Sequence, residues 1–132
     1  MSRAASPDTR DRHTVYVIED DSDLRRTIGE ALEAQGYDVV AAANGAEALE
    51  ALRREGTRPC LILLDLMMPV MNGYEFRKEQ RADPALAEIP VVVISAHARG
   101  QVDADVFLPK PIGLRRLLAV IADFCKVTPT TA

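Results

Sequence analysis

Acidic, hydroxyl and amine side chains stand at the ends of four mainly apolar stretches of this sequence. The central stretch, residues 60–73, reads CLILLDLMMPVMNG, and its apolar residues lead without a polar break into Asp65. A single charge at that place is too costly to bury without partners. The other side chains of this kind are Glu19 and Asp20 after residues 14–18, Ser95 after residues 91–94, and Lys110 after residues 105–108.

These side chains would form a coherent reactive set if the fold brought them together. Three neighbouring carboxylates repel one another, so some hold protons unless a cation neutralises them. Oxygen ligands without His or Cys suit a hard ion, and Mg²⁺ keeps bound waters and accepts a phosphate oxygen. Lys110 indicates an occupant that brings further negative charge, such as a phosphoryl group. Asp65 could then be the nucleophile, giving an aspartyl phosphate that the metal, Lys110 and Ser95 stabilise.

The elements that must position these residues alternate between strands and helices. The predicted strands are residues 14–18, 37–42, 61–64, 91–94 and, more weakly, 105–108. The signals for helix ends are Ser22-Asp23 and Gly36 for the first helix, Asn44/Glu47 and Asn72/Glu75 as capping pairs for the next two, and an apolar stripe from Leu114 to Phe124 for the last. This alternation predicts a doubly wound parallel sheet with helices on both faces, whose strands share one carboxyl edge where ligands bind.

Composition places the chain in an ordinary class. A length of 132 residues fits one domain, which we expect at residues 13–126 between flexible tails at 1–12 and 127–132. The net charge of −4 argues against nucleic acid as a partner. The amino terminus has no signal-peptide core and no run could cross a membrane, which favours a cytoplasmic location. Cys60 and Cys125 lie far apart in sequence and are predicted to be buried, reduced thiols.

Four motifs, in chain order, resemble the receiver domain of bacterial two-component response regulators: Glu19-Asp20, DLMMPVMNG, VVVISA and FLPKP. The resemblance covers about residues 14–126. It implies a flavodoxin-like fold with strand order 2-1-3-4-5. It also implies a regulatory phosphoacceptor rather than an enzyme, with a sensor histidine kinase or a histidine phosphotransfer protein as partner.

The resemblance also implies a role for individual residues. Asp65 would be the phosphoacceptor. Glu19, Asp20, Asp65 and the backbone carbonyl of Met67 would hold Mg²⁺. The remaining positions are Ser95 and Lys110 on the phosphoryl group, Phe107 as the aromatic switch that responds to Ser95, and Lys110-Pro111 as a candidate cis peptide.

The segment between Ser95 and Lys110 departs from the family pattern. It holds only fourteen residues, and residues 97–104 (HARGQVDA) cannot form an amphipathic helix. We therefore expect the fourth helix to be missing or reduced to one turn. One face of the fourth and fifth strands would then lose its cover, with Asp105 as the only charged guard of the edge, and could pair two copies as a homodimer or dock another partner.

Other interpretations stay open at this point. The chain could be a pseudo-receiver that binds partners without being phosphorylated, or a phosphohydrolase similar to haloacid dehalogenase-type enzymes, although those carry Asp-x-Asp. Glu19 and Asp20 could form only a helix-capping cluster, Ser95 a strand-end hydroxyl and Lys110 a surface lysine. His97 is placed either to tune hydrolysis of the phosphoryl group or to face solvent.

Overall fold

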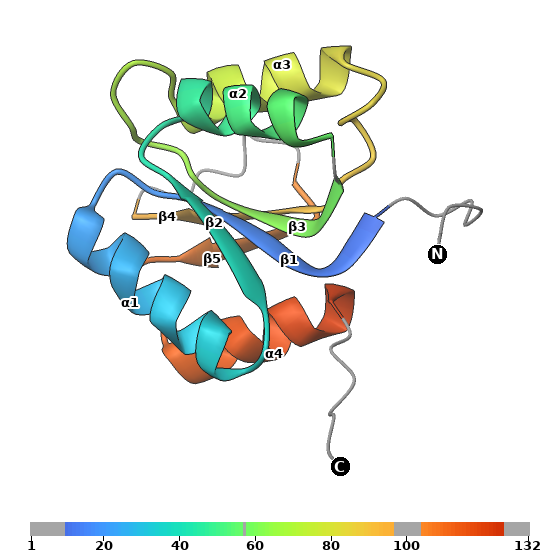
Figure 1. Cartoon of the computed structure of the whole chain (residues 1–132). Helices are drawn as coiled ribbons and strands as arrows, with labels where there is room; N and C mark the ends of the chain where they lie inside the picture. Colours follow the sequence, from blue (N-terminus) through green and yellow to red (C-terminus); the bar gives the residue numbers. More distant parts are fainter. Residues whose placement is uncertain (1–9, 57, 97–103, 126–132) are drawn as a thin grey trace, which may run out of the picture.

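The computed structural model describes residues 10–56, 58–96 and 104–125, and it forms a five-stranded parallel sheet in the order β2-β1-β3-β4-β5. Helices cover both faces of this sheet (Figure 1). This is the flavodoxin-like, doubly wound arrangement that the sequence predicts. In chain order the elements are β1 (Arg10–Ile18), α1 (Ser22–Ala34), β2 (Asp38–Ala42), α2 (Gly45–Glu55), β3 (Arg58–Asp65), α3 (Gly73–Ala82), β4 (Val91–Ser95), β5 (Val106–Pro109) and α4 (Leu114–Phe124).

The composition of the central strand β3 explains why helices cover both faces of the sheet. Every residue of β3 from Pro59 to Asp65 is buried, which fits a continuous apolar run between two helical layers. Alternate side chains enter different cores: Ile62 and Leu64 face α2 and α3, while Leu61 and Leu63 face α1 and α4. Figure 1 shows these two helix pairs on opposite faces of the sheet.

Side-chain caps fix where the helices begin. Asn72 and Glu75 form the predicted capping box at the start of α3, each side chain accepting a hydrogen bond from the other residue's amide. At α2 the Asn44 side chain accepts from the Glu47 amide, but Glu47 Oε1 accepts from Ala43 and so reaches one residue further back than a capping box requires. Gly36 follows α1 with a φ of +99°, as predicted for a residue after a helix.

The first strand starts earlier than predicted. β1 begins at Arg10, not at residue 14, so residues 10–12 belong to a strand although the prediction assigned them to a flexible tail. The reason is added pairing with β3, which joins Arg10 to Arg58 and Asp11 to Pro59 before a register shift. Residues 1–9 and 127–132, the rest of the predicted tails, lie outside the described residues, as does residue 126 at the predicted end of the domain.

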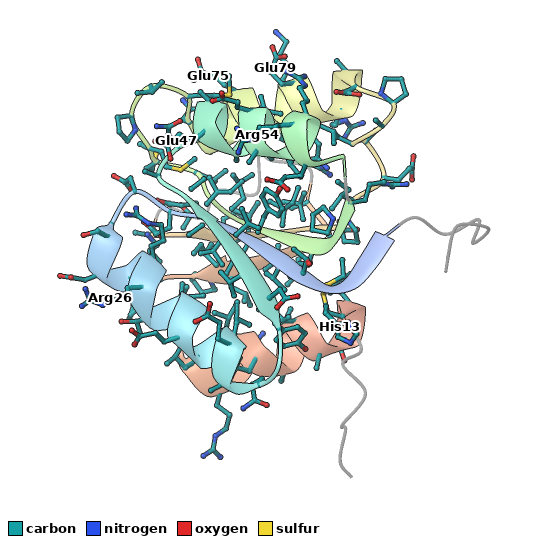
Figure 2. The ribbon with its side chains drawn as sticks, viewed as in Figure 1. His13, Arg26, Glu47, Arg54, Glu75 and Glu79 are labelled. Carbon is teal, nitrogen blue, oxygen red and sulfur yellow. A yellow bond between two sulfur atoms is a disulfide. The ribbon has the colours of Figure 1, made fainter. Side chains whose placement is uncertain are left out.

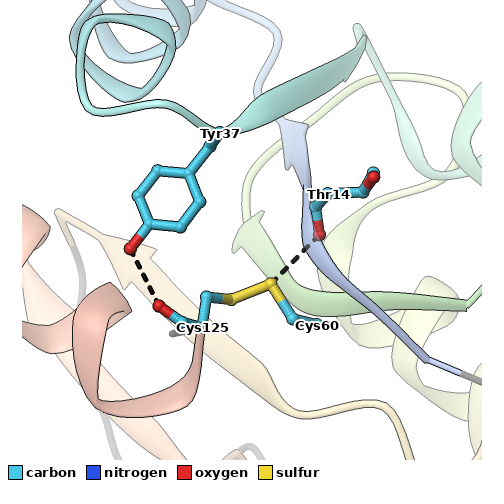
Figure 3. Close-up of a disulfide and its surroundings, with 4 residues drawn as sticks. All are labelled: Thr14, Tyr37, Cys60 and Cys125. Carbon is cyan, nitrogen blue, oxygen red and sulfur yellow. Dashed lines mark hydrogen bonds between the residues drawn. A yellow bond between two sulfur atoms is a disulfide. The ribbon is translucent and has the colours of Figure 1, made fainter. Parts of the chain in front are cut away.

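The prediction of two reduced thiols is wrong, because Cys60 and Cys125 form a disulfide. Cys60 lies near the start of β3, and Cys125 is the C-cap residue of α4. The packing of α4 under the sheet brings their Cα atoms to 5.5 Å (Figure 3). Their separation of 65 residues gave no hint of this proximity. The Tyr37 hydroxyl donates a hydrogen bond of 3.0 Å to the Cys125 carbonyl, and Cys60 Sγ lies 3.2 Å from the Thr14 carbonyl oxygen. The end of α4 is therefore tied both to β3 and to the turn before β2.

Between β4 and β5 the described residues contain no helix, consistent with the predicted loss or shortening of the fourth helix; residues 97–103 lie outside them. The predicted bare face on β4 is not found, however. Val91 and Val93 are fully buried in the core that Phe76, Leu86 and Ile89 also form, whereas Val106 and Phe107 on β5 are half-buried. The segment between α3 and β4 thus supplies part of the missing cover.

Asp105 does stand at the sheet edge, and it is bonded there. Its Oδ2 atom accepts a hydrogen bond of 2.8 Å from the Val91 amide, and its own amide donates to the Val91 carbonyl at 2.9 Å. These two bonds cap the start of β4.

No helix in the described part of the chain has the length and apolar character needed to cross a membrane.

Candidate active site

The parallel register brings the predicted site residues to one edge of the sheet. Ile18 pairs with Leu64, Asp65 with Ile94, and Ser95 with Pro109. Because the strands run in the same direction, the side chains at or just after their ends converge. Glu19, Asp20, Asp65, Ser95 and Lys110 are therefore all placed at the carboxyl edge, as the sequence predicts.

Glu19, Asp20 and Asp65 form a compact carboxylate cluster. One oxygen from each residue lies within 4.8 Å of the others. Glu19 and Asp65 are buried, whereas Asp20 is exposed at the mouth of a cavity of about 370 Å³ that Met67, Ala96 and Lys110 also line. An all-oxygen donor set of this charge fits a hard divalent cation that keeps part of its water shell.

Lys110 is the cationic partner of this cluster. Its Nζ atom lies 3.0 Å from Glu19 Oε1 and 3.5 Å from Asp65 Oδ2. The backbone holds Lys110 in place, since its amide donates to the Ser95 carbonyl at 2.9 Å. The Lys110-Pro111 peptide is cis, as the family resemblance implied. Lys110 thus joins β4 and β5 to the acidic residues on β1 and β3.

Burial and crowding shift the protonation of the site. The pKa of Asp65 is raised from 3.8 to about 7, first by burial and then by the Glu19 charge, against the opposing effect of Lys110. For Lys110, burial lowers the pKa, but the contacts with Glu19 and Asp65 outweigh it and the pKa rises overall. Without a cation, the Asp65 carboxyl is therefore protonated in about half of the molecules near pH 7 and in most of them at lower pH.

The loop after Asp65 is held close to it. Asp65 Oδ1 accepts a hydrogen bond of 3.4 Å from the Met67 amide, a contact that sequence reasoning, which singled out the Met67 carbonyl, missed. The Gly73 amide donates to the Leu66 carbonyl and closes the loop. A Cβ atom on Gly73 would lie only 2.6 Å from the Asp65 carbonyl oxygen, so this approach requires glycine.

The loop after Glu19 is equally fixed. Glu19 Oε2 accepts from the Asp21 amide at 3.0 Å, and Asp21 caps α1 by accepting from the Asp23 and Leu24 amides. Arg25, which the sequence analysis did not single out, donates to the Glu19 carbonyl at 2.7 Å. The sequence does give a weak indication of this contact. An arginine near a helix N-terminus interacts unfavourably with the helix dipole, which suggests that a different contact stabilises it.

The two predicted switch residues lie on neighbouring strands. Ser95 is buried at the end of β4, and Phe107 packs half-buried on β5 against the α2–α3 side of the core. The response of the Phe107 ring to Ser95 stays a prediction. His97 lies outside the described residues.

A buried aspartate lies beside two further carboxylates and a lysine at the carboxyl edge of a doubly wound sheet, which is the arrangement that the resemblance implies for a receiver domain. Comparison with known families agrees, because residues 15–122 match the response regulator receiver domain. The chain belongs to this receiver-domain family of two-component signalling proteins, and the pseudo-receiver interpretation is not favoured.

Individual relatives fit this assignment. The chain is 31% identical to the polar-differentiation response regulator DivK of Brucella anthropi over 84% of its length and 94% of DivK. It is 37% identical to the CpxR homolog of Haemophilus influenzae over 81% of the chain, but it spans only 48% of that transcriptional regulatory protein. The receiver domain of a histidine kinase from Syntrophus aciditrophicus superposes with a TM-score of 0.78 at 27% identity, covering 91% of this chain and 97% of that one.

Proposed function

We propose that Asp65 is the phosphoacceptor of this receiver domain, and that it takes its phosphoryl group from a phosphohistidine of a sensor histidine kinase or a histidine phosphotransfer protein. The observation that carries the proposal is the place of Asp65: buried, 3.5 Å from Lys110, and on a cavity that opens to solvent. A carboxylate in that position can be reached by a donor from outside while its charge is balanced from within.

In the proposed transfer, an Asp65 carboxylate oxygen attacks phosphorus, and the phosphorus–nitrogen bond to the donor imidazole breaks. The imidazole nitrogen keeps the electron pair, and an acyl phosphate forms on Asp65. Mg²⁺, held by Glu19, Asp20, Asp65 and the Met67 carbonyl, would neutralise the charge gathered on the phosphoryl oxygens. Lys110 would exchange part of its contact with Asp65 for a phosphoryl oxygen, and the Ser95 hydroxyl would donate to another.

The product would act by changing which partner the domain binds. We propose Ser95 and Phe107 as the path by which the phosphoryl group alters the β4–β5 side of the domain, in a regulatory role rather than as a turnover enzyme. A cytoplasmic location and pairing of two copies along the edge strand β5, where Val106 and Phe107 are half-buried, belong to the same proposal, and scattering measurements with and without phosphodonor test the pairing.

The phosphoacceptor proposal is tested with a small acyl phosphate donor and magnesium. The protein should acquire one base-labile phosphoryl group, and Asp65→Asn should abolish it. Asp123→Asn, at an exposed aspartate on α4, is the matched control and should label like the wild type. Labelling that persists in Asp65→Asn would place the nucleophile elsewhere.

A further inference from the structure

We propose that Arg25 is a positioning residue for the metal site, acting through the peptide that joins Glu19 to Asp20; this inference rests on the proposed function. The Arg25 Nη1 atom donates to the Glu19 carbonyl oxygen at 2.7 Å. That carbonyl is part of the peptide plane between the two predicted metal ligands. A charged donor at this distance makes a short, strong hydrogen bond that resists rotation of the plane.

The two acidic residues differ in what else holds them. The Glu19 carboxylate is anchored on both oxygens, by Lys110 Nζ at 3.0 Å and by the Asp21 amide at 3.0 Å. The Asp20 side chain is exposed, and in the described part of the chain no hydrogen bond or ion pair of its carboxylate is found. The direction of Asp20 therefore depends on the backbone that carries it.

Four contacts to this backbone set that direction: the bond from the Asp21 amide to Glu19 Oε2 at 3.0 Å, and the three that follow. The Glu19 amide donates to the Ala42 carbonyl at 3.0 Å, the Arg25 amide donates to the Asp21 carbonyl at 2.8 Å, and the Arg25 side chain holds the carbonyl between them. Without the guanidinium, the Glu19–Asp20 peptide would be fixed at its two flanks but free to tilt in the middle. Outer-shell contacts of this kind typically change metal affinity by about 10- to 100-fold.

The neighbouring Arg26 supplies a matched control. It lies on the same helix but on its outer side, where its side chain is 66% exposed and 3.5 Å from Asp23 (Figure 2). Both arginines place a positive charge near the acidic cluster, so removing either charge should strengthen cation binding if electrostatics alone matters. If Arg25 positions the site, removing Arg25 should instead weaken cation binding, whereas removing Arg26 should not. The two variants therefore distinguish positioning from simple electrostatics.

The test is a magnesium titration of the metal-free protein without phosphodonor. Calorimetry or amide chemical shifts report the binding. Arg25→Gln should raise the Kd for Mg²⁺ by about tenfold. Arg26→Gln should leave it unchanged or slightly lower, and Arg25→Lys, which keeps the charge and one donor, should fall between Arg25→Gln and the wild type. At saturating magnesium the Arg25→Gln protein should regain the wild-type rate of phosphorylation, because positioning is restored by mass action. Urea unfolding without magnesium shows whether each variant is folded, and if Arg25→Gln is not, Arg25→Lys carries the test.

Each outcome has a distinct meaning. If the wild type binds magnesium and Arg25→Gln binds it as tightly as Arg26→Gln does, Arg25 has no positioning role and the proposed function is left intact. Arg25→Lys takes the place of Arg25→Gln in this comparison if the latter is not folded. Wild-type protein that binds no magnesium overturns the proposed metal site and this inference with it. A weakened affinity confined to the Arg25 variants supports both.

Discussion

Replacing Asp65 with asparagine should stabilise the metal-free protein, and the gain should grow with pH. The pKa of Asp65 is about 7 in the folded protein and 3.8 as its ordinary value. The folded state therefore holds a proton that the unfolded chain has already lost, so stability from this group is present at low pH and disappears as pH rises from about 4 to about 7. Asparagine keeps the shape of the side chain but does not titrate.

The size of the effect follows from the pKa difference. Each pH unit corresponds to about 1.4 kcal/mol, so the carboxylate costs the folded protein about 4 kcal/mol once it is fully ionised. The unfolded chain is already ionised at about pH 5, so roughly 3 kcal/mol of this should appear between about pH 5 and pH 8. The free energy of unfolding of Asp65→Asn should therefore exceed that of the wild type, and the difference should grow by that amount between about pH 5 and pH 8.

The assay is urea unfolding in the presence of a chelator at several pH values. Subtracting the wild-type curve from the Asp65→Asn curve removes the groups that titrate away from the site, and leaves Asp65 together with its effect on Glu19 and Lys110. Asp123→Asn should show a pH-independent difference near zero. Adding magnesium at high pH should stabilise the wild type more than Asp65→Asn, since the cation replaces the proton. The interpretation of a crowded, buried carboxylate pair would be refuted if the difference in unfolding free energy stayed constant across pH. It would also be refuted if the wild type became more stable relative to the variant above about pH 7.

Two further predictions concern the framework of the site. Reduction of the Cys60–Cys125 disulfide, or Cys125→Ser, should lower the free energy of unfolding by up to about 4 kcal/mol, because the bridge closes a loop across 65 residues; equal melting temperatures with and without reductant would count against a bridge in solution. Gly73→Ala should cost roughly 1–3 kcal/mol and disturb the loop beside Asp65, since its Cβ would meet the Asp65 carbonyl at 2.6 Å. Gly113→Ala has no atom within 4 Å of its Cβ, so in the same urea titration it should lose only the advantage of about 1 kcal/mol or less that glycine has over alanine at the N-cap of α4.

The sequence predicted the site better than its surroundings. Each site residue follows an apolar run, and parallel strands bring such positions together whatever the details of packing, so Glu19, Asp65, Ser95 and Lys110 could be placed without coordinates. The disulfide could not, because it depends on how α4 docks against the start of β3. The bond from Arg25 to the Glu19 carbonyl depends on the orientation of one peptide plane, which residue types do not encode.

The predicted open face failed for a similar reason. The short segment between Ser95 and Lys110 did indicate a missing or shortened fourth helix, but the cover of Val91 and Val93 comes partly from Leu86 and Ile89. These residues lie in what reads as a polar, proline-bracketed loop between α3 and β4. Packing from outside the regular elements is hard to infer from periodicity, since a loop has none.

The central claim is that Asp65 carries the phosphoryl group. The most direct measurement is peptide mapping by mass spectrometry after phosphorylation with a small acyl phosphate and magnesium. We expect a single modified site, in the peptide that contains Asp65, and we expect the modification to be lost when magnesium is removed. A phosphoryl group on any other residue, or an unmodified protein under conditions in which magnesium binding is verified, would contradict it.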